Sequence, residues 1–222
     1  LNVVSFGIKN LKSDVKFIKI KKNTKDFQIT IEMNNLRKNF TVLNNFQSNI
    51  YNTLSALAII SVNKDIFQLD ERFFLNFKTP SGRGDLLKVK IKKKTINLID
   101  ETYNSNPLSL KSAILNYDKI NSKGSKKYLL IGDMLELGRL SNKLHLSIAP
   151  IINRTKVDKV FVKGKKAQLI FKKLNKSKRG KVLKNKQDII KLIKNRLNNN
   201  DYLMIKASNA TGFNKIIRNL KG

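Results

Sequence analysis

The sequence predicts an α/β protein whose larger part is a mostly parallel sheet covered by helices. From about residue 85 onward, short apolar runs of the strand type alternate with helical patterns of roughly 10 to 15 residues, which is typical of βαβ units. Residues 1 to 43 instead alternate polar and apolar side chains with the strand period of two. The chain therefore reads as a small part made of strands and helices, followed by a larger α/β domain.

The N-terminal part is predicted to hold short antiparallel strands followed by two helices. The strands are "DVKFIKIKK", "DFQITIEM" and "NFTVLNN", separated by clusters of Asn and Lys. In "NFQSNIYNTLSALAIISVNK", Ile50, Leu54 and Leu57 share one helix face beside small residues, so we expect this helix to be largely buried. A second helix is expected over about residues 65–76.

A domain boundary is predicted in "KTPSGRGD", where Pro80, Gly82 and Gly84 interrupt the periodic patterns. We therefore divide the chain into residues 1–77 and residues 78–222.

The second part is predicted to alternate strands and helices with both faces of its sheet covered. The strands are "LLKVKI", "TINLID", "KYLLIGD", "DKVFV", "KVL" and "DYLMIKAS". The helices cover about residues 107–120, 141–153, 165–174 and 186–197, and a last helix runs to the C-terminus. Ligands of such sheets bind at the carboxyl ends of the strands, which selects the loops "IDETYNSNP", "IGDMLELG", "VKGKK" and "IKASNATGF".

Composition excludes several classes of function. The 222 residues contain no cysteine, which rules out disulfides, thiolate metal sites and a cysteine nucleophile. No apolar run approaches the roughly 18 residues of a membrane span, and the N-terminus lacks a signal-peptide pattern, so we expect a cytoplasmic protein without a membrane span. The chain begins with Leu in a strand-like segment, from which we expect it to be a fragment of a longer protein.

The net charge of +31 has two interpretations. A strongly basic chain can be a nucleic-acid-binding module. Here the lysines are spread through nearly every segment and are not interleaved with aromatic side chains that could stack on bases. We favour a general enrichment of Lys and Asn at solvated positions, and a basic α/β nucleic-acid-binding module is the alternative.

Polar side chains crowd the loop that follows the strand "TINLID". Asp100 and Glu101 end the strand, and Tyr103, Asn104 and Asn106 follow before a helix that starts with a proline. Taken singly, Asn106 is a helix cap and Asn104 a turn residue. Taken together, this density of carboxylates and amides at a sheet end can bind a ribose or a small zwitterion.

The other loops offer weaker signals. Asp133 and Glu136 follow the next strand and are either turn and cap residues or ligand groups, while Lys206 and Ser208 end the last strand. Arg83 is either a solvated side chain or a residue whose planar guanidinium group recognises phosphate or ribose oxygens. His145, the only histidine, is interpreted as a helix-surface or packing residue. No GxxxxGK[ST] phosphate loop occurs.

The segments "SNIYNTLSALA", "PSGRGD", "LIDETYNSNPLSLKSAI", "IGDMLELG" followed by "SNKLH", and "YLMIKASNATG" together resemble the Mur ligases. The resemblance is strongest to the member of this family that adds D-alanyl-D-alanine to UDP-N-acetylmuramoyl-tripeptide, and it covers nearly the whole chain. The loops of sister enzymes, of the DYAHTP or DGAHNP type, do not fit "DETYNSNP". A sister ligase that adds another amino acid is a further alternative.

The resemblance implies a fragment of a three-domain enzyme of peptidoglycan synthesis: the strand-and-helix end of a central ATPase domain, then a complete Rossmann-like C-terminal domain. The implied reaction uses ATP to convert the tripeptide carboxylate into an acyl phosphate, which the amine of D-alanyl-D-alanine attacks. The P-loop, the catalytic residues and the Mg²⁺ ligands are expected upstream of Leu1. The resemblance further implies a monomer that does not bind nucleic acid and a fragment that is inactive alone.

The resemblance also assigns roles to matching residues. Asn49, Asn52, Arg83 and Asp100 match nucleotide-binding positions. The positions implied for the dipeptide substrate are Tyr103, Asn104, Asn106, Asp133, Met134, Glu136, Lys206 and Ser208. Two positions depart from the family pattern: Ser48 stands where the family has a histidine, and Asn209 where an arginine often follows the lysine-containing motif.

Overall fold

The computed structural model describes residues 3–10, 12–45, 47–76 and 81–221. The chain divides into two compact units, residues 1–78 and 79–222. The boundary predicted between residues 77 and 78 lies outside the described residues.

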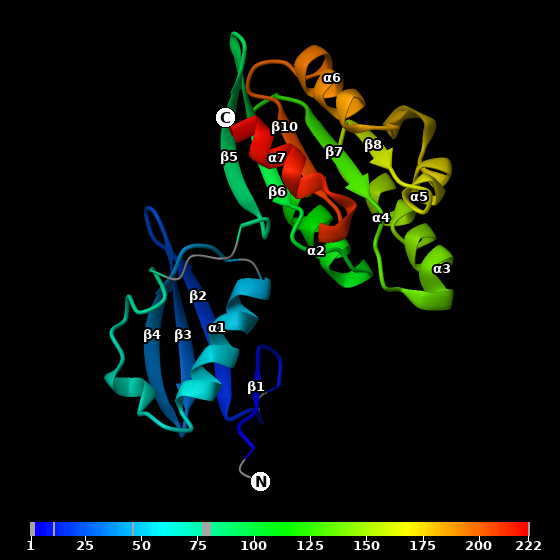
Figure 1. Cartoon of the computed structure of the whole chain (residues 1–222). Coiled ribbons are helices and arrows are strands. Elements are labelled where there is room, and N and C mark those ends of the chain that lie inside the picture. Colours follow the sequence, from blue (N-terminus) through cyan, green and yellow to red (C-terminus); the bar gives the residue numbers. More distant parts are fainter. Residues whose placement is uncertain (1–2, 11, 46, 77–80, 222) are drawn as a thin grey trace. The chain divides into compact units, whose positions relative to one another are not determined.

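The described residues of the first unit form a four-stranded sheet and one α-helix (Figure 1). Its strands are β1 (Phe6–Gly7), β2 (Val15–Lys22), β3 (Phe27–Met33) and β4 (Leu36–Val42), arranged in that order. The pairs β2–β3 and β3–β4 are antiparallel as predicted, whereas β1 pairs with β2 in parallel. The helix α1 (Gln47–Ile60) buries Leu54 and Leu57 in one core with Ile29, Ile31 and Phe40, which are 0% exposed.

The helix predicted over residues 65–76 does not form. Only a 3₁₀ turn, η1 (Ile66–Gln68), appears there, and turns follow it. Asp65 Oδ1 accepts a hydrogen bond from Phe67 N–H at 2.8 Å, and Asp70 Oδ1 accepts one from Arg72 N–H at 2.7 Å. Such local side-chain bonds to the backbone compete with helical hydrogen bonds, which explains why the apolar spacing alone misled the prediction.

The second unit is built on a six-stranded sheet in the order β5-β6-β10-β7-β8-β9. The strands are β5 (Asp85–Ile91), β6 (Lys94–Glu101), β7 (Lys127–Gly132), β8 (Lys159–Lys163), β9 (Arg179–Val182) and β10 (Tyr202–Lys206). Neighbouring strands from β6 to β9 are parallel, and only β5 is antiparallel to its neighbour. The predicted mostly parallel sheet is therefore confirmed.

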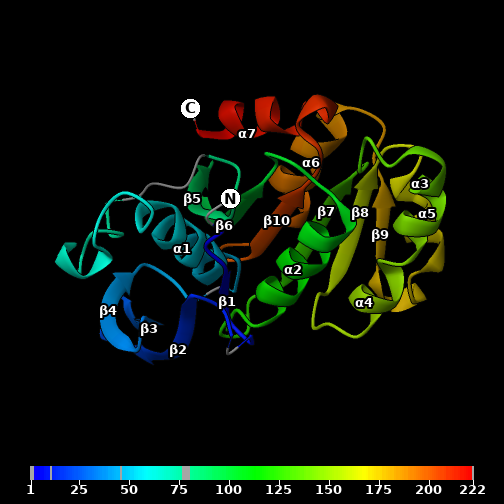
Figure 2. The ribbon, with the colours of Figure 1, turned by 90° about the horizontal axis from the view of Figure 1, so that it is seen from below.

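Helices cover both faces of this sheet (Figure 2). The helices α6 (Lys186–Arg196) and α7 (Phe213–Lys221) pack on one face, where Leu98, Leu130 and Ile205 are buried. The helices α2 (Pro107–Asp118), α4 (Ala149–Asn153) and α5 (Ala167–Lys173) contribute to the other core. Because successive strand residues point to opposite faces, Leu129 and Met204 belong to this second core.

The helix predicted over residues 141–153 is broken into α3 (Ser141–Leu146) and α4. Pro150 lies in the first turn of α4. Proline has no N–H to bond the carbonyl four residues earlier and its ring clashes with that carbonyl, so a single helix cannot continue through this position. Among the described residues, no helix is long and apolar enough to cross a membrane.

Candidate functional site

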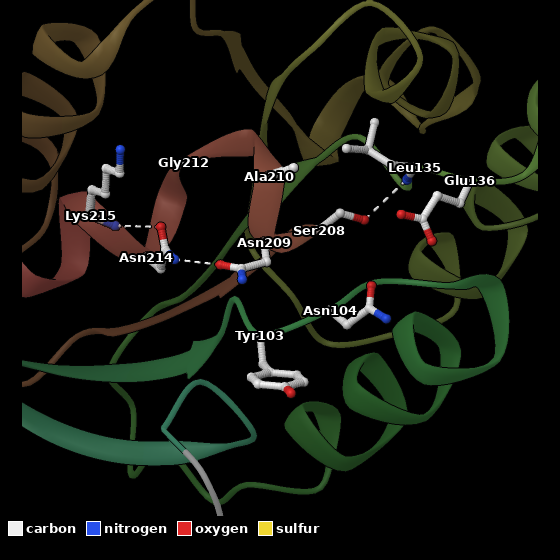
Figure 3. A pocket seen from close by; sticks show the side chains of 10 residues that line it. All are labelled: Tyr103, Asn104, Leu135, Glu136, Ser208, Asn209, Ala210, Gly212, Asn214 and Lys215. Carbon is white, nitrogen blue, oxygen red and sulfur yellow. Dashed lines mark hydrogen bonds between the residues drawn. The ribbon is translucent and has the colours of Figure 1, made fainter.

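Loops from three adjacent strands enclose a pocket of about 570 Å³ in the second unit (Figure 3). The strand β10 lies between β6 and β7, so the loops at their carboxyl ends meet. The residues that line the pocket are Tyr103, Asn104, Leu135, Glu136, Ser208, Asn209, Ala210, Gly212, Asn214 and Lys215. Carboxyl ends of parallel strands are where ligands of open α/β sheets bind.

Lys206 is the most buried charged group beside this pocket. Its side chain is 2% exposed, and its Nζ lies 3.2 Å from Glu101 Oε2 across paired positions of β10 and β6. Nζ also donates a hydrogen bond to Asn104 O at 2.8 Å. Burial raises the pKa of Glu101 and lowers the pKa of Lys206, and each partner opposes the shift of the other. Lys206 thus fixes the backbone of the loop that carries Asn104.

Ser208 joins loops that follow three different strands. Its Oγ accepts a hydrogen bond from Leu135 N–H at 3.0 Å and donates one to Ser105 O at 3.2 Å. Ser208 is buried and also lines the pocket (Figure 3). A single hydroxyl therefore sets the spacing between the loops after β6 and β7.

The residues of the loop after β7 have different surroundings. Glu136 lines the pocket, with its backbone in the left-handed region at φ 62°. The side chain of Met134 lies in the core and is 1% exposed. Asp133 Oδ1 accepts a hydrogen bond from Ala167 N–H at 2.7 Å, which fastens the loop to the start of α5. Of these three predicted substrate residues, only Glu136 is among the lining residues.

Asp100 faces a second, smaller cavity of about 240 Å³. Its Oδ1 accepts hydrogen bonds from Thr102 N–H at 3.1 Å and Thr102 Oγ–H at 2.7 Å. Tyr103, Asn209 and Asn214 line both cavities. The loop after β6 is therefore two-sided, with Asp100 on one cavity and Asn104 on the other.

Arg83 lies over the ring of Tyr103, with its guanidinium carbon 4.1 Å from the ring centroid. The loop that carries Arg83 is held against β6 because Tyr103 N–H donates to Gly82 O at 3.0 Å and Gly84 N–H donates to Asp100 O at 2.8 Å. A cation–π contact orients the guanidinium without using its hydrogen-bond donors. Arg83 stays exposed and able to bind an anion.

Asn49 and Asn52, the other predicted nucleotide residues, lie on α1 in the first unit. Asn52 is exposed, and Asn49 Nδ2 donates a hydrogen bond to Asn44 O at 3.3 Å.

Asn106 is a helix cap, the first of its two interpretations. Its Oδ1 accepts a hydrogen bond from Ser109 N–H at 2.8 Å, and its own N–H donates to Ser109 Oγ at 3.0 Å, which completes a capping box on α2. Asn106 is absent from the residues that line either cavity. We expect Asn106→Ala to lower the free energy of unfolding by about 1 kcal/mol, measured by urea denaturation. A larger effect on ligand binding than on stability would contradict this role.

Several residues at the site were not predicted. Glu101 was expected at this sheet end, but its pairing with Lys206 was not, because that pairing depends on β10 lying beside β6, an order that the sequence did not reveal. Asn214 and Lys215 come from α7, beyond the loops that the sequence drew attention to. His145 is 0% exposed, so the helix-surface interpretation is wrong.

Metal ligands are not grouped in the described parts of the chain. No cluster of three or more His, Cys, Asp or Glu that could hold a metal ion occurs among residues 3–10, 12–45, 47–76 and 81–221. The acidic groups at the site, Asp100, Glu101 and Glu136, are divided between a cavity, an ion pair and a pocket.

Known proteins resemble this chain in both sequence and fold. The family model described as "Mur ligase, glutamate ligase domain" matches residues 83–209. The UDP-N-acetylmuramoyl-tripeptide--D-alanyl-D-alanine ligase of Bacillus subtilis is 31% identical over 176 residues, which are 77% of this chain and 38% of that protein. The ligase of the same name from Rickettsia prowazekii is 26% identical over 219 residues, 97% of this chain and 46% of that protein.

A solved structure extends the likeness to the fold. The crystal structure of the MurF ligase from Thermotoga maritima in complex with ADP superposes with a TM-score of 0.73 at 21% identity, covering 99% of this chain and 48% of that one. The chain thus spans less than half the length of each of these relatives. Because the family model matches more than half of the 222 residues, the chain belongs to the Mur ligase family.

Proposed function

We propose that this chain is part of an ATP-dependent ligase of peptidoglycan synthesis that adds D-alanyl-D-alanine to UDP-N-acetylmuramoyl-tripeptide. The observation that carries the proposal is the pocket at the carboxyl ends of β6, β10 and β7. Its loops, "DETYNSNP", "GDMLELG" and "KASNATG", are the segments that resemble this ligase. The 31% identity to the Bacillus subtilis ligase supports the same assignment.

The chemistry of the pocket suits a small zwitterion. Its volume of about 570 Å³ lies within the roughly 300–1,000 Å³ of small-molecule sites. Glu136 supplies a negative charge for an ammonium group, and Lys215 supplies a positive charge for a carboxylate. The amides of Asn104 and Asn209 offer donors and acceptors to a peptide bond. Many members of the family have an arginine at the position of Asn209. In this chain Lys215 would bind the substrate carboxylate in its place.

The smaller cavity is the proposed nucleotide side. Asp100 lines it and can accept hydrogen bonds from ribose hydroxyls, while Arg83 offers charge-assisted hydrogen bonds to phosphate oxygens. Asn49 and Asn52, which lie on α1, are also proposed nucleotide-binding residues. The presence of ADP in the Thermotoga maritima structure supports nucleotide use by this family.

The proposed reaction has two steps. The tripeptide carboxylate takes the γ-phosphoryl group of ATP and releases ADP; the amine of D-alanyl-D-alanine then attacks the acyl phosphate, which forms the amide and releases phosphate and a proton. This chain contributes positioning of the amine and of the nucleotide. No group of three or more side chains that could hold a metal ion occurs among the described residues, so no Mg²⁺ ligand is assigned to them.

The test is phosphate release by the complete protein that contains these 222 residues. We expect release in the presence of ATP and UDP-N-acetylmuramoyl-tripeptide to depend on D-alanyl-D-alanine. Release that depends on a single amino acid instead would assign a sister ligase. No release with any amine would contradict the proposed function.

Asn104→Ala tests the dipeptide side of the pocket. The side chain lines the pocket, and its Oδ1 also accepts a hydrogen bond from Ser105 N–H at 2.7 Å. We expect the KM for D-alanyl-D-alanine to rise about tenfold, the effect of losing about 1.4 kcal/mol of binding, with the KM for ATP unchanged. Leu108→Ala on the exposed surface of α2 is the control and should change neither KM. An unchanged dipeptide KM in Asn104→Ala would remove this residue from the site.

A further inference from the structure

His145 connects α3 to the pocket through backbone hydrogen bonds. The side chain is 0% exposed, and its Nε2 lies 3.0 Å from Met134 N. Its Nδ1 lies 2.7 Å from Ser141 O, one turn earlier on α3. Both ring nitrogens therefore contact backbone atoms, and one of these atoms belongs to the loop that carries Glu136.

These two contacts fix the tautomer of the ring. A backbone N–H can only donate, so Nε2 must carry a lone pair toward Met134. A backbone carbonyl can only accept, so Nδ1 must carry the proton that points to Ser141 O. The neutral Nδ1–H form satisfies both partners, whereas a doubly protonated ring would set N–H against N–H at Met134.

The bond from Met134 is one of two that hold successive amides of the loop. Met134 N–H donates to His145 Nε2, and the next amide, Leu135 N–H, donates to Ser208 Oγ at 3.0 Å. The next residue, Glu136, then has its backbone at φ 62°, an uncommon conformation for a residue with a side chain. Such conformations persist where the surrounding structure over-determines them.

Glu136 is the acidic residue among the ten that line the pocket. Figure 3 shows its carboxylate on the same side of the pocket as Ser208, with Asn104 across from it. Met134 and Leu135, whose amides make these two hydrogen bonds, directly precede Glu136 in the loop, so we expect the bonds to determine where Glu136 lies. His145 reaches neither cavity itself.

We propose that His145 is a positioning residue for the amine-binding wall of the dipeptide pocket: in its Nδ1–H form it holds Met134 N–H, and thereby sets where Glu136 meets the ammonium group of the substrate. This inference rests on the proposed function. It concerns the dipeptide side alone, since no residue of the loop after β7 lines the smaller cavity.

Packing alone would also keep a ring buried at this position, and the two roles differ in their kinetic effect. A packing residue affects stability and active fraction, and leaves the KM for each substrate unchanged. A positioning residue affects the KM for D-alanyl-D-alanine selectively, because a displaced Glu136 weakens dipeptide binding without touching the nucleotide side.

Two substitutions separate these roles in the complete protein. His145→Leu removes the acceptor for Met134 N–H, and we expect the KM for D-alanyl-D-alanine to rise at least about tenfold while the KM for ATP changes less than about twofold. His145→Gln places an amide oxygen near the position of Nε2 and should recover most of the wild-type KM. Tyr117→Phe is the matched control, since it removes another buried hydrogen bond, to Tyr128 O at 3.0 Å, on a residue that lines neither cavity.

The outcomes are distinguishable. If the wild type is active and His145→Leu leaves the KM for D-alanyl-D-alanine unchanged, this inference is overturned and the proposed function stands. The same holds if His145→Leu and Tyr117→Phe change that KM equally. A wild type without dipeptide-dependent phosphate release overturns the proposed function, and the inference with it.

The ring form can be measured separately, because His145 is the only histidine of the 222-residue chain. We expect long-range ¹H–¹⁵N correlation spectra of the histidine-labelled chain to show one imidazole in the Nδ1–H form at neutral pH. An Nε2–H tautomer or a doubly protonated ring would overturn the inference whatever the kinetics.

Discussion

Lys206→Met is expected to lower the free energy of unfolding by about 3 kcal/mol. Removing one partner of a buried ion pair costs about 3–5 kcal/mol, and Glu101, with its side chain 22% exposed, keeps some contact with water, which puts the effect at the lower end. Asn104 O also loses its hydrogen bond from Nζ. Urea denaturation of the chain measures the difference.

The effect of Lys206→Met should depend on pH in a known direction. The pKa of Glu101 is already raised above its ordinary value of 4.5 by burial, and loss of the Lys206 charge raises it further. A carboxyl with a raised pKa in the folded state is unfavourable once ionised, so its cost is absent below the unfolded pKa and grows as pH rises toward the folded pKa. Lys206→Met should therefore lose less stability at about pH 4 than at about pH 7.

The double variant Glu101→Gln with Lys206→Met is the control for this pair. It removes both charges, so it should recover part of the free energy of unfolding lost in Lys206→Met. It should also remove the pH dependence that the Glu101 carboxyl adds to that loss. A Lys206→Met protein within about 0.5 kcal/mol of wild type at neutral pH would show that the pair does not hold the site.

Gly164→Ala is expected to lower the free energy of unfolding by about 2–6 kcal/mol and to raise the KM for D-alanyl-D-alanine. Gly164 has φ 128°, a conformation that side chains rarely adopt and that costs about 1–3 kcal/mol. A Cβ at this position would also overlap the carboxylate of Asp133, and such overpacking costs about 1–3 kcal/mol more. Since Asp133 begins the loop that carries Glu136, its displacement reaches the pocket.

Gly124→Ala isolates the backbone part of this effect. Gly124 also has a positive φ, at 86°, but nothing lies within 4 Å of the position of a Cβ. We expect a loss of about 1–2 kcal/mol with an unchanged dipeptide KM. Equal losses of unfolding free energy in Gly124→Ala and Gly164→Ala would show that the overlap of the added Cβ with Asp133 does not destabilise the protein.

The sequence predicted the fold where the hydrophobic period was long and uninterrupted. The strand that ends at Asp100 and Glu101, the helix that starts at Pro107 and the mostly parallel sheet all follow from local patterns. The break at Pro150 could have been predicted, because a proline inside a helical pattern usually interrupts the helix. The turns between Asp65 and Asp70 depend on side-chain bonds to the backbone that apolar spacing does not record.

The candidate site was predictable in its loops and not in its contacts. The rule on carboxyl ends of strands selected the segments of Asn104, Glu136 and Ser208, which line the pocket. The pairing of Lys206 with Glu101 depends on strand order, and the contact of His145 with Met134 depends on how the loop after β7 folds against α3. Long-range pairings of this kind leave no periodic signal in a single sequence.

The most direct test of the central claim is the mass of the product. The complete protein would be incubated with ATP, UDP-N-acetylmuramoyl-tripeptide and D-alanyl-D-alanine, and the nucleotide-linked peptide analysed by mass spectrometry. We expect its mass to increase by that of the dipeptide less one water in wild type, and, at dipeptide concentrations below KM, to do so about tenfold more slowly in Asn104→Ala. A nucleotide-linked peptide of unchanged mass would contradict the assignment. So would a peptide extended by a single amino acid when free amino acids are supplied together with D-alanyl-D-alanine.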